Sequence, residues 1–136
     1  MLGKVARYLP AMLLIGISAV AQTPSTVPPL PPPGRLIDVG GWKLHLNCTG
    51  EGRASQGTVI LESGAGDFSV EWSLVQPRLA AFARVCSYDR AGDGRSELGP
   101  HPRTFHQVAY ELHILLANAG IKPPIVLAGC GKMRAK

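Results

Sequence analysis

The chain has 136 residues, of which 46% are hydrophobic and 17% charged, a composition typical of one folded domain and not of a disordered segment. The net charge of +5 is mild, and the basic residues are scattered without interleaved aromatic side chains, so nucleic-acid binding is not expected. Cys48, Cys86 and Cys130 lack the spacing of a metal site, and we expect neither a metal nor another cofactor.

The first 21 residues have the layout of a secretory signal peptide. Lys4 and Arg7 precede an apolar run that is too short to span a membrane, and the small-x-small pattern ends at Ala21. We therefore expect cleavage after Ala21, a secreted or periplasmic location and no stable membrane anchor in the mature chain. The proline-rich stretch 22–34 is predicted to be an extended linker.

A hairpin opens the predicted domain, which covers residues 35–129. Leu36–Val39 and Trp42–Asn47 alternate apolar and polar residues around Gly40-Gly41, because glycine accepts the positive φ angles of a two-residue turn. Later apolar runs without alternation predict strands that are covered on both faces. These runs are Thr58–Leu61, Val85–Tyr88 and Ile125–Ala128.

Two helices are predicted between these strands. One covers 71–83, with Pro77 in its first turns. The other covers Thr104–Ala119, where Thr104 is the N-cap, Gln107 completes a capping box and Gly120 ends the helix. Its apolar stripe comprises Phe105, Val108, Ala109, Leu112, Leu115, Leu116 and Ala119. The alternation of strands and helices predicts an α/β fold, with a mixed, mostly parallel sheet and flanking helices.

Three segments then resemble one known family. They are Leu61–Gly66 (LESGAG), Tyr88–Ser96 (YDRAGDGRS) and Ile125–Gly129 (IVLAG), each of which follows or forms a predicted strand. Their order is similar to that in the α/β-hydrolase fold superfamily, in its esterase, lipase and peptidase-like branch. The resemblance covers the N-terminal portion of that fold, its first five strands, and implies a small-molecule ester or amide as substrate.

The resemblance also implies roles for two loops. The loop after the first apolar strand would stabilise the oxyanion of acyl transfer through the backbone N–H of Ala65, with Gly64 and Gly66 as neighbouring candidates. In the second loop a structural role is favoured over a metal or phosphate site. Asp89 and Arg90 would hold that loop by hydrogen bonds and a charge pair, while Gly92 and Gly94 allow its bend.

The nucleophile turn departs from the family pattern Gly-x-Ser-x-Gly. Gly129 matches the first glycine, but Gly131 stands where the serine is expected and Met133 replaces the second glycine. Residues 130–136 form an aberrant tail of the kind that a frameshift or an early stop would produce. Cys130 is one residue too early to replace the serine, and the histidines all precede this turn. These are His45, His101, His106 and His113.

Three hypotheses about function therefore stay open. In the first, the chain descends from an ester or amide hydrolase and is inactive as it stands, because the nucleophile, acid and histidine are missing. In the second, it is an exported binding or interaction module that keeps part of the hydrolase fold without the chemistry. In the third, which is the least favoured, it is an enzyme with an unexpected nucleophile such as Cys130. The Cys48–Cys86 disulfide is also left open, and Cys86 as a small buried apolar residue is favoured. The sequence indicates no particular oligomeric state.

Overall fold

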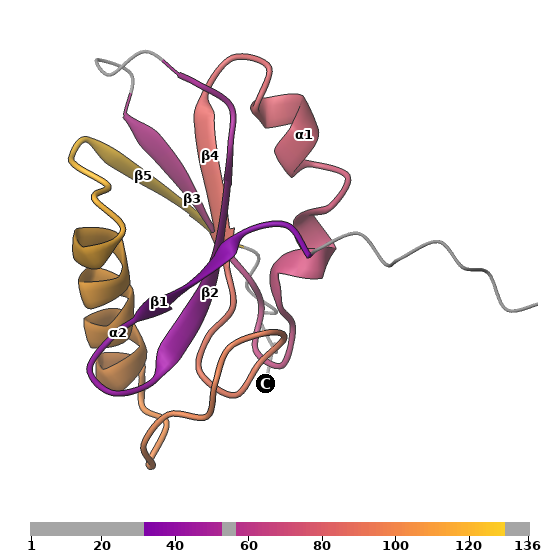
Figure 1. Ribbon diagram of the computed structural model, residues 1–136. Helices are drawn as coiled ribbons and strands as arrows, with labels where there is room; N and C mark the ends of the chain where they lie inside the picture. Colours follow the sequence, from indigo (N-terminus) through magenta and orange to yellow (C-terminus); the bar gives the residue numbers. More distant parts are fainter. Residues whose placement is uncertain (1–31, 53–56, 130–136) are drawn as a thin grey trace, which may run out of the picture. The chain divides into compact units, whose positions relative to one another are not determined.

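The computed structural model describes residues 32–52 and 57–129 (Figure 1). Its strands form one mixed sheet in the order β1-β2-β4-β3-β5. The elements in chain order are β1 (Arg35–Asp38), β2 (Lys43–Thr49), β3 (Thr58–Glu62), the 3₁₀-helix η2 (Ser69–Trp72), α1 (Gln76–Leu79), β4 (Arg84–Tyr88), α2 (Phe105–Asn118) and β5 (Ile125–Gly129). β3 pairs in parallel with both β4 and β5, so the predicted mixed, mostly parallel sheet is confirmed.

The predicted hairpin is also confirmed. β1 and β2 pair antiparallel, and Gly40 and Gly41 take φ angles of 119° and 106° between them. The carboxylate of Asp38 accepts hydrogen bonds from both glycine N–H groups, at 2.9 and 3.3 Å. The turn is therefore stabilised by its own residues, and β2 continues from it to pair antiparallel with β4.

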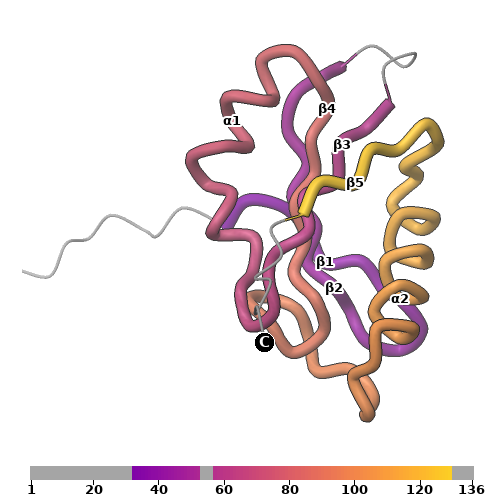
Figure 2. The backbone as a smooth tube through the Cα atoms, turned by 180° about the vertical axis from the view of Figure 1, so that it is seen from behind, coloured from indigo at the N-terminus to yellow at the C-terminus, as the bar shows by residue number. Residues whose placement is uncertain are grey.

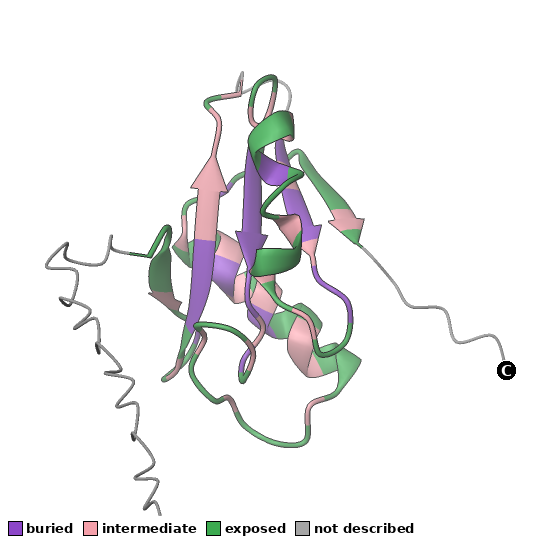
Figure 3. Cartoon of the chain, turned by 90° about the vertical axis from the view of Figure 1, so that its right-hand side faces the viewer, coloured by how far each residue is buried: buried purple, intermediate pink, exposed green. Residues whose placement is uncertain are grey.

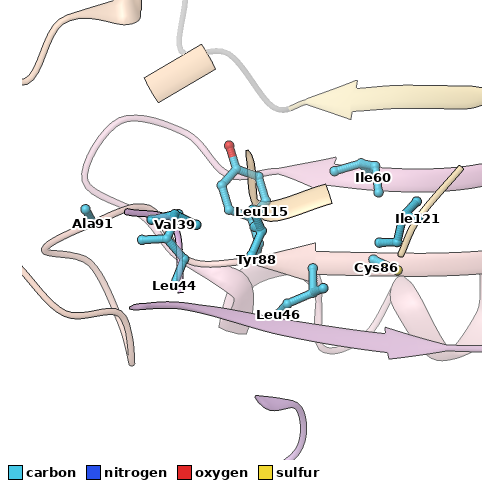
Figure 4. Close-up of a cluster of buried hydrophobic side chains, with 9 residues drawn as sticks. All are labelled: Val39, Leu44, Leu46, Ile60, Cys86, Tyr88, Ala91, Leu115 and Ile121. Atoms are coloured by element: carbon cyan, nitrogen blue, oxygen red, sulfur yellow. The ribbon is translucent and has the colours of Figure 1, made fainter. Parts of the chain in front are cut away.

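The helices cover opposite faces of the sheet, α2 on one side and α1 on the other (Figures 1 and 2). The α2 face carries the apolar core, in which Leu115 of the helix and Ile121 after it pack against the strands (Figure 4). The other face is the more polar one, because His45 of β2 and Ser87 of β4 point there, although it also buries Leu61 and Val85. Its buried residues include His45, Gln76, Ser87 and Asp89.

The predicted helix over 71–83 is wrong, because the segment is broken into η2 and the single turn α1. Pro77 stands at the start of α1, where its missing N–H cannot continue a helix from upstream. Leu74 and Phe82, two large apolar residues of this segment, are 77% and 68% exposed. Gln76 is buried instead and bonds Asn47, Thr49 and Ser87.

The predicted second helix is confirmed as α2, with corrections at its first turn. The Thr104 hydroxyl accepts the Gln107 N–H at 3.2 Å, and Gly120 ends the helix with φ +73°. The Gln107 side chain does not complete a capping box, because its amide donates to Glu111 at 3.0 Å. Phe105 is 96% exposed and so lies outside the apolar stripe in which it was placed.

β5 differs from its prediction as a strand covered on both faces. Among the described residues it is an edge strand, and its apolar side chains are largely exposed (Figure 3). Val126 and Leu127 are 53% and 59% exposed. An apolar edge with unpaired backbone groups is a template for pairing with another chain.

This edge is expected to drive self-association, which Val126→Lys should weaken at least about tenfold by adding a charge to the edge. Sedimentation velocity over a range of concentrations measures the effect. Leu74→Lys, which replaces another exposed apolar residue, is the matched control and should leave association unchanged. Equal association of all three proteins would show that β5 is not the contact.

Several predicted segments lie outside the described residues. These are the signal peptide 1–21, most of the linker 22–34 and the tail 130–136, which includes Cys130, Gly131 and Met133. None of the helices within 32–52 and 57–129 combines the length and apolar character needed to span a bilayer.

Candidate functional site

The loop after β3, residues Ser63–Asp67, is held by Arg90 from the loop after β4. The Arg90 guanidinium donates to the carbonyl oxygens of Ser63, at 3.0 Å, and of Gly64. It also pairs with the Glu62 carboxylate at 2.9 Å. On the other side of the loop, the Gly64 N–H donates to the Glu71 carboxylate at 3.1 Å. The carbonyl oxygens of Ser63 and Gly64 are therefore held facing Arg90.

This contact determines where the Ala65 N–H points. In a trans peptide the C=O and N–H are antiparallel, so the Ala65 N–H points away from the guanidinium that binds the Gly64 carbonyl. Within the described residues, no hydrogen bond uses the N–H of Ala65 or Gly66, and both residues are exposed. Of the three predicted oxyanion donors, Gly64 is engaged with Glu71, which leaves Ala65 and Gly66.

The end of β5 lies beside this loop. Gly129 pairs with Glu62 in the parallel β3–β5 ladder, so β5 ends at the same carboxyl end of the sheet where the Ser63–Asp67 loop begins. Carboxyl ends of parallel strands are the place where α/β sheets bind ligands. Gly131, the position of the expected nucleophile, is the second residue after Gly129 and lies outside the described residues.

Asp89 is buried at the start of the second predicted loop. Its carboxylate accepts hydrogen bonds from the backbone N–H groups of Ser69, at 2.7 Å, and Arg95, at 2.9 Å, and from His45 Nδ1 at 3.0 Å. Burial alone would raise the pKa of Asp89, but these hydrogen bonds outweigh it and hold the pKa well below its usual range. Asp89 therefore stays ionised and joins η2, β2 and its own loop.

The glycines of this loop have the geometry that its bend requires. Gly92 and Gly94 take φ angles of 88° and 53°. A Cβ on Gly94 would lie 2.5 Å from the Asp89 carboxylate, so only glycine fits there. Asp89 and Arg90 do not pair with each other, since Asp89 faces His45 whereas Arg90 faces Glu62 and Asp93.

His45 and Glu111 are ionisable residues whose buried contacts sequence reasoning missed. The hydrogen bond to Asp89 raises the pKa of His45 above its usual value, against the opposing effect of burial. The Glu111 carboxylate accepts hydrogen bonds from both terminal nitrogens of Arg103, each at 2.6 Å. This ion pair joins the segment before α2 to the middle of the helix. No sequence signal pointed to His45, which takes a polar position in the alternation of Trp42–Asn47, and the nearest signal for Glu111 was its place beside the apolar stripe of the helix.

Metal binding has no evident donor set in the described part of the chain. No group of three or more His, Cys, Asp and Glu side chains there is placed to hold an ion. His106 and His113 are both exposed on α2.

Comparison with known proteins shows which proteins share this geometry. No protein-family model matches the chain. An AB hydrolase superfamily protein of Gibberella zeae is 38% identical over 87 residues, which are 62% of this chain and 27% of that protein. The probable transporter efuK of Hormonema carpetanum is 38% identical over 97 residues, 69% of this chain and 14% of that protein.

Solved structures of α/β-hydrolases are also similar to this chain. The enol-lactonase of Burkholderia xenovorans LB400 is 27% identical with a TM-score of 0.61, over 71% of this chain and 36% of that one. The chain thus spans about a third or less of the proteins it resembles. The five-stranded sheet and its loops define an α/β-hydrolase fold. The chain shares the fold of the α/β-hydrolase superfamily.

Proposed function

We propose that the chain is a hydrolase by descent, in which the Ser63–Asp67 loop provides the oxyanion half of a site for ester or amide substrates. The carrying observation is the orientation of this loop, whose Ser63 and Gly64 carbonyls bind Arg90 while the N–H groups of Ala65 and Gly66 stay free among the described residues. Two N–H groups aimed at a developing oxyanion are the donors that acyl transfer uses, and each contributes about 3 kcal/mol.

We further propose that the 136-residue polypeptide by itself has no esterase activity. The residue at the expected nucleophile position, Gly131, has no side chain, and the sequence from Cys130 to Lys136 contains no serine, acid or histidine. The oxyanion donors alone lack a group that attacks the carbonyl carbon.

Hydrolysis of p-nitrophenyl acetate by the purified chain is therefore expected at no more than about twice the rate with an equal amount of the same chain unfolded in urea, a threshold far below the usual effect of an activated nucleophile. Cys130→Ala should not change this rate. Turnover well above the rate of the unfolded chain that disappears in Cys130→Ala would instead establish a cysteine nucleophile.

The oxyanion half can be tested separately by NMR with methylphosphonate, an anion that mimics the tetrahedral oxygen. The Ala65 and Gly66 amide protons should shift downfield at millimolar anion, while the engaged Gly64 amide should not. If no amide of this loop responds, the oxyanion role of the loop is refuted, and the exported binding or interaction module becomes the favoured hypothesis.

Export remains part of the proposal. The layout of residues 1–21 supports it, and so does the Cys48–Cys86 disulfide that the structure forms between β2 and β4. Disulfides persist in oxidising compartments such as the periplasm and the extracellular space. We accordingly propose a signal peptide 1–21, a linker 22–34 and a hydrolase portion 35–129.

A further inference from the structure

The first described residues of the domain lie directly on His45. The Pro33 carbonyl oxygen is 2.8 Å from His45 Nε2. Gly34 follows with φ +90°, and a Cβ there would lie 2.6 Å from the same nitrogen. Gly34 is thus required where the backbone crosses the imidazole ring. Pro33 and Gly34 are named the entry segment.

Both ring nitrogens of His45 face acceptors. A carbonyl oxygen cannot donate, so the hydrogen bond with Pro33 requires a proton on Nε2. Nδ1 faces the Asp89 carboxylate at 3.0 Å, and this carboxylate already accepts two backbone N–H groups. Nδ1 therefore also carries a proton. His45 is an imidazolium, and it is only 3% exposed.

Loss of one proton breaks one particular contact. The ionised Asp89 keeps the proton on Nδ1, because a lone pair facing a carboxylate is the costlier arrangement. The lone pair then stands on Nε2 and faces the Pro33 carbonyl oxygen, which repels it. Deprotonation thus spares the Asp89 contact and removes the one that holds the entry segment.

The charged groups that act on His45 are Asp89, which favours the cation, and Arg95, which opposes it. The entry segment and Ser69 of η2 present neutral groups. Because the pKa of folded His45 is raised above 6.5, the contact is complete below that pH and is lost as pH rises through the raised value.

We propose that His45 is a pH-dependent latch, which as imidazolium holds the entry segment on the domain and on deprotonation releases it. The released residues border a cavity of about 330 Å³ on the polar face of the sheet. Its walls include Pro33, His45, Phe68, Val70 and Pro77. Release of Pro33 removes one wall, so the cavity opens at high pH.

NMR of the full chain between pH 5 and 10 tests the latch. The ¹⁵N signals of the His45 ring should show both nitrogens protonated at low pH and Nε2 losing its proton as pH rises. The order parameter of the Gly34 amide should fall with the same midpoint, from about 0.85, typical of rigid backbone, to below about 0.6.

His45→Gln supplies a side-chain N–H that does not titrate, and it should keep Gly34 ordered across the whole range. His106→Gln, at an exposed position of α2, is the matched control and should titrate like the unchanged protein. The latch is refuted if Nε2 lacks a proton at pH 5, or if Gly34 stays ordered while His45 of the unchanged protein loses its proton. If His45→Gln fails to fold, the measurements on the unchanged protein are sufficient to test the latch.

Discussion

Asp89→Ala is expected to lower the free energy of unfolding by about 3–5 kcal/mol at pH 7, the usual cost of removing one partner of a buried pair. Asp89 is 1% exposed, and its loss leaves the N–H groups of Ser69 and Arg95 and the ring of His45 without their acceptor. A domain of this size has a total stability of about 5–15 kcal/mol, so the variant should be close to unfolding. Urea denaturation followed by circular dichroism measures the change.

The stability difference between Asp89→Ala and the unchanged protein also depends on pH. Because the folded pKa of Asp89 lies below its usual 3.8, its contribution is present above pH 3.8 and is lost as pH falls through the folded value. The difference between the two proteins should therefore shrink in acid. Asp93→Ala is the matched control in the same loop, with a long contact to Arg90 at 3.4 Å and an expected loss within about 1 kcal/mol. A loss for Asp89→Ala no larger than that of the control would contradict the assigned network.

Reduction of the Cys48–Cys86 disulfide is expected to cost about 4 kcal/mol of unfolding free energy. The two cysteines are 38 residues apart, and the cost follows from the chain entropy that the cross-link removes from the unfolded state. The bond joins β2 to β4, where the antiparallel hairpin meets the parallel part of the sheet. Urea unfolding with and without dithiothreitol measures the difference.

Cys48→Ala should have the stability of the reduced protein and should not respond to dithiothreitol. Cys130→Ala keeps the paired cysteines and should respond like the unchanged chain. Two free thiols at positions 48 and 86 in the purified exported protein, detected by alkylation and mass spectrometry, would refute the disulfide. They would favour the interpretation of Cys86 as a small buried apolar residue.

Local signals predicted the elements whose causes are local. Gly40-Gly41 placed the hairpin turn, and Thr104 and Gly120 placed the ends of α2, because a cap or a positive φ depends on residues a few positions away. Pro77 was a local signal of the same kind. It was read as part of a longer helix, although it marks where α1 begins.

The contacts of the candidate site depend on distant residues and could not be predicted. His45 and Asp89 are 44 positions apart, and Arg90 binds carbonyl groups 26 and 27 positions away. Such pairs exist only after β2, β3 and β4 have assembled. The resemblance indicated the Ala65 region, but the engagement of Gly64 by Glu71 required the return of η2 onto the loop.

The account depends most on the parallel pairing of β3 and β5. This pairing places the carboxyl end of β5, after Gly129, beside the oxyanion donors of the Ser63–Asp67 loop. Backbone proton contacts between β3 and β5, measured by NMR on the full chain, test it most directly. A parallel ladder with Ile60 opposite Leu127 and Glu62 opposite Gly129 is the expected result. A β5 that is unpaired, antiparallel or paired with β1 would contradict the account.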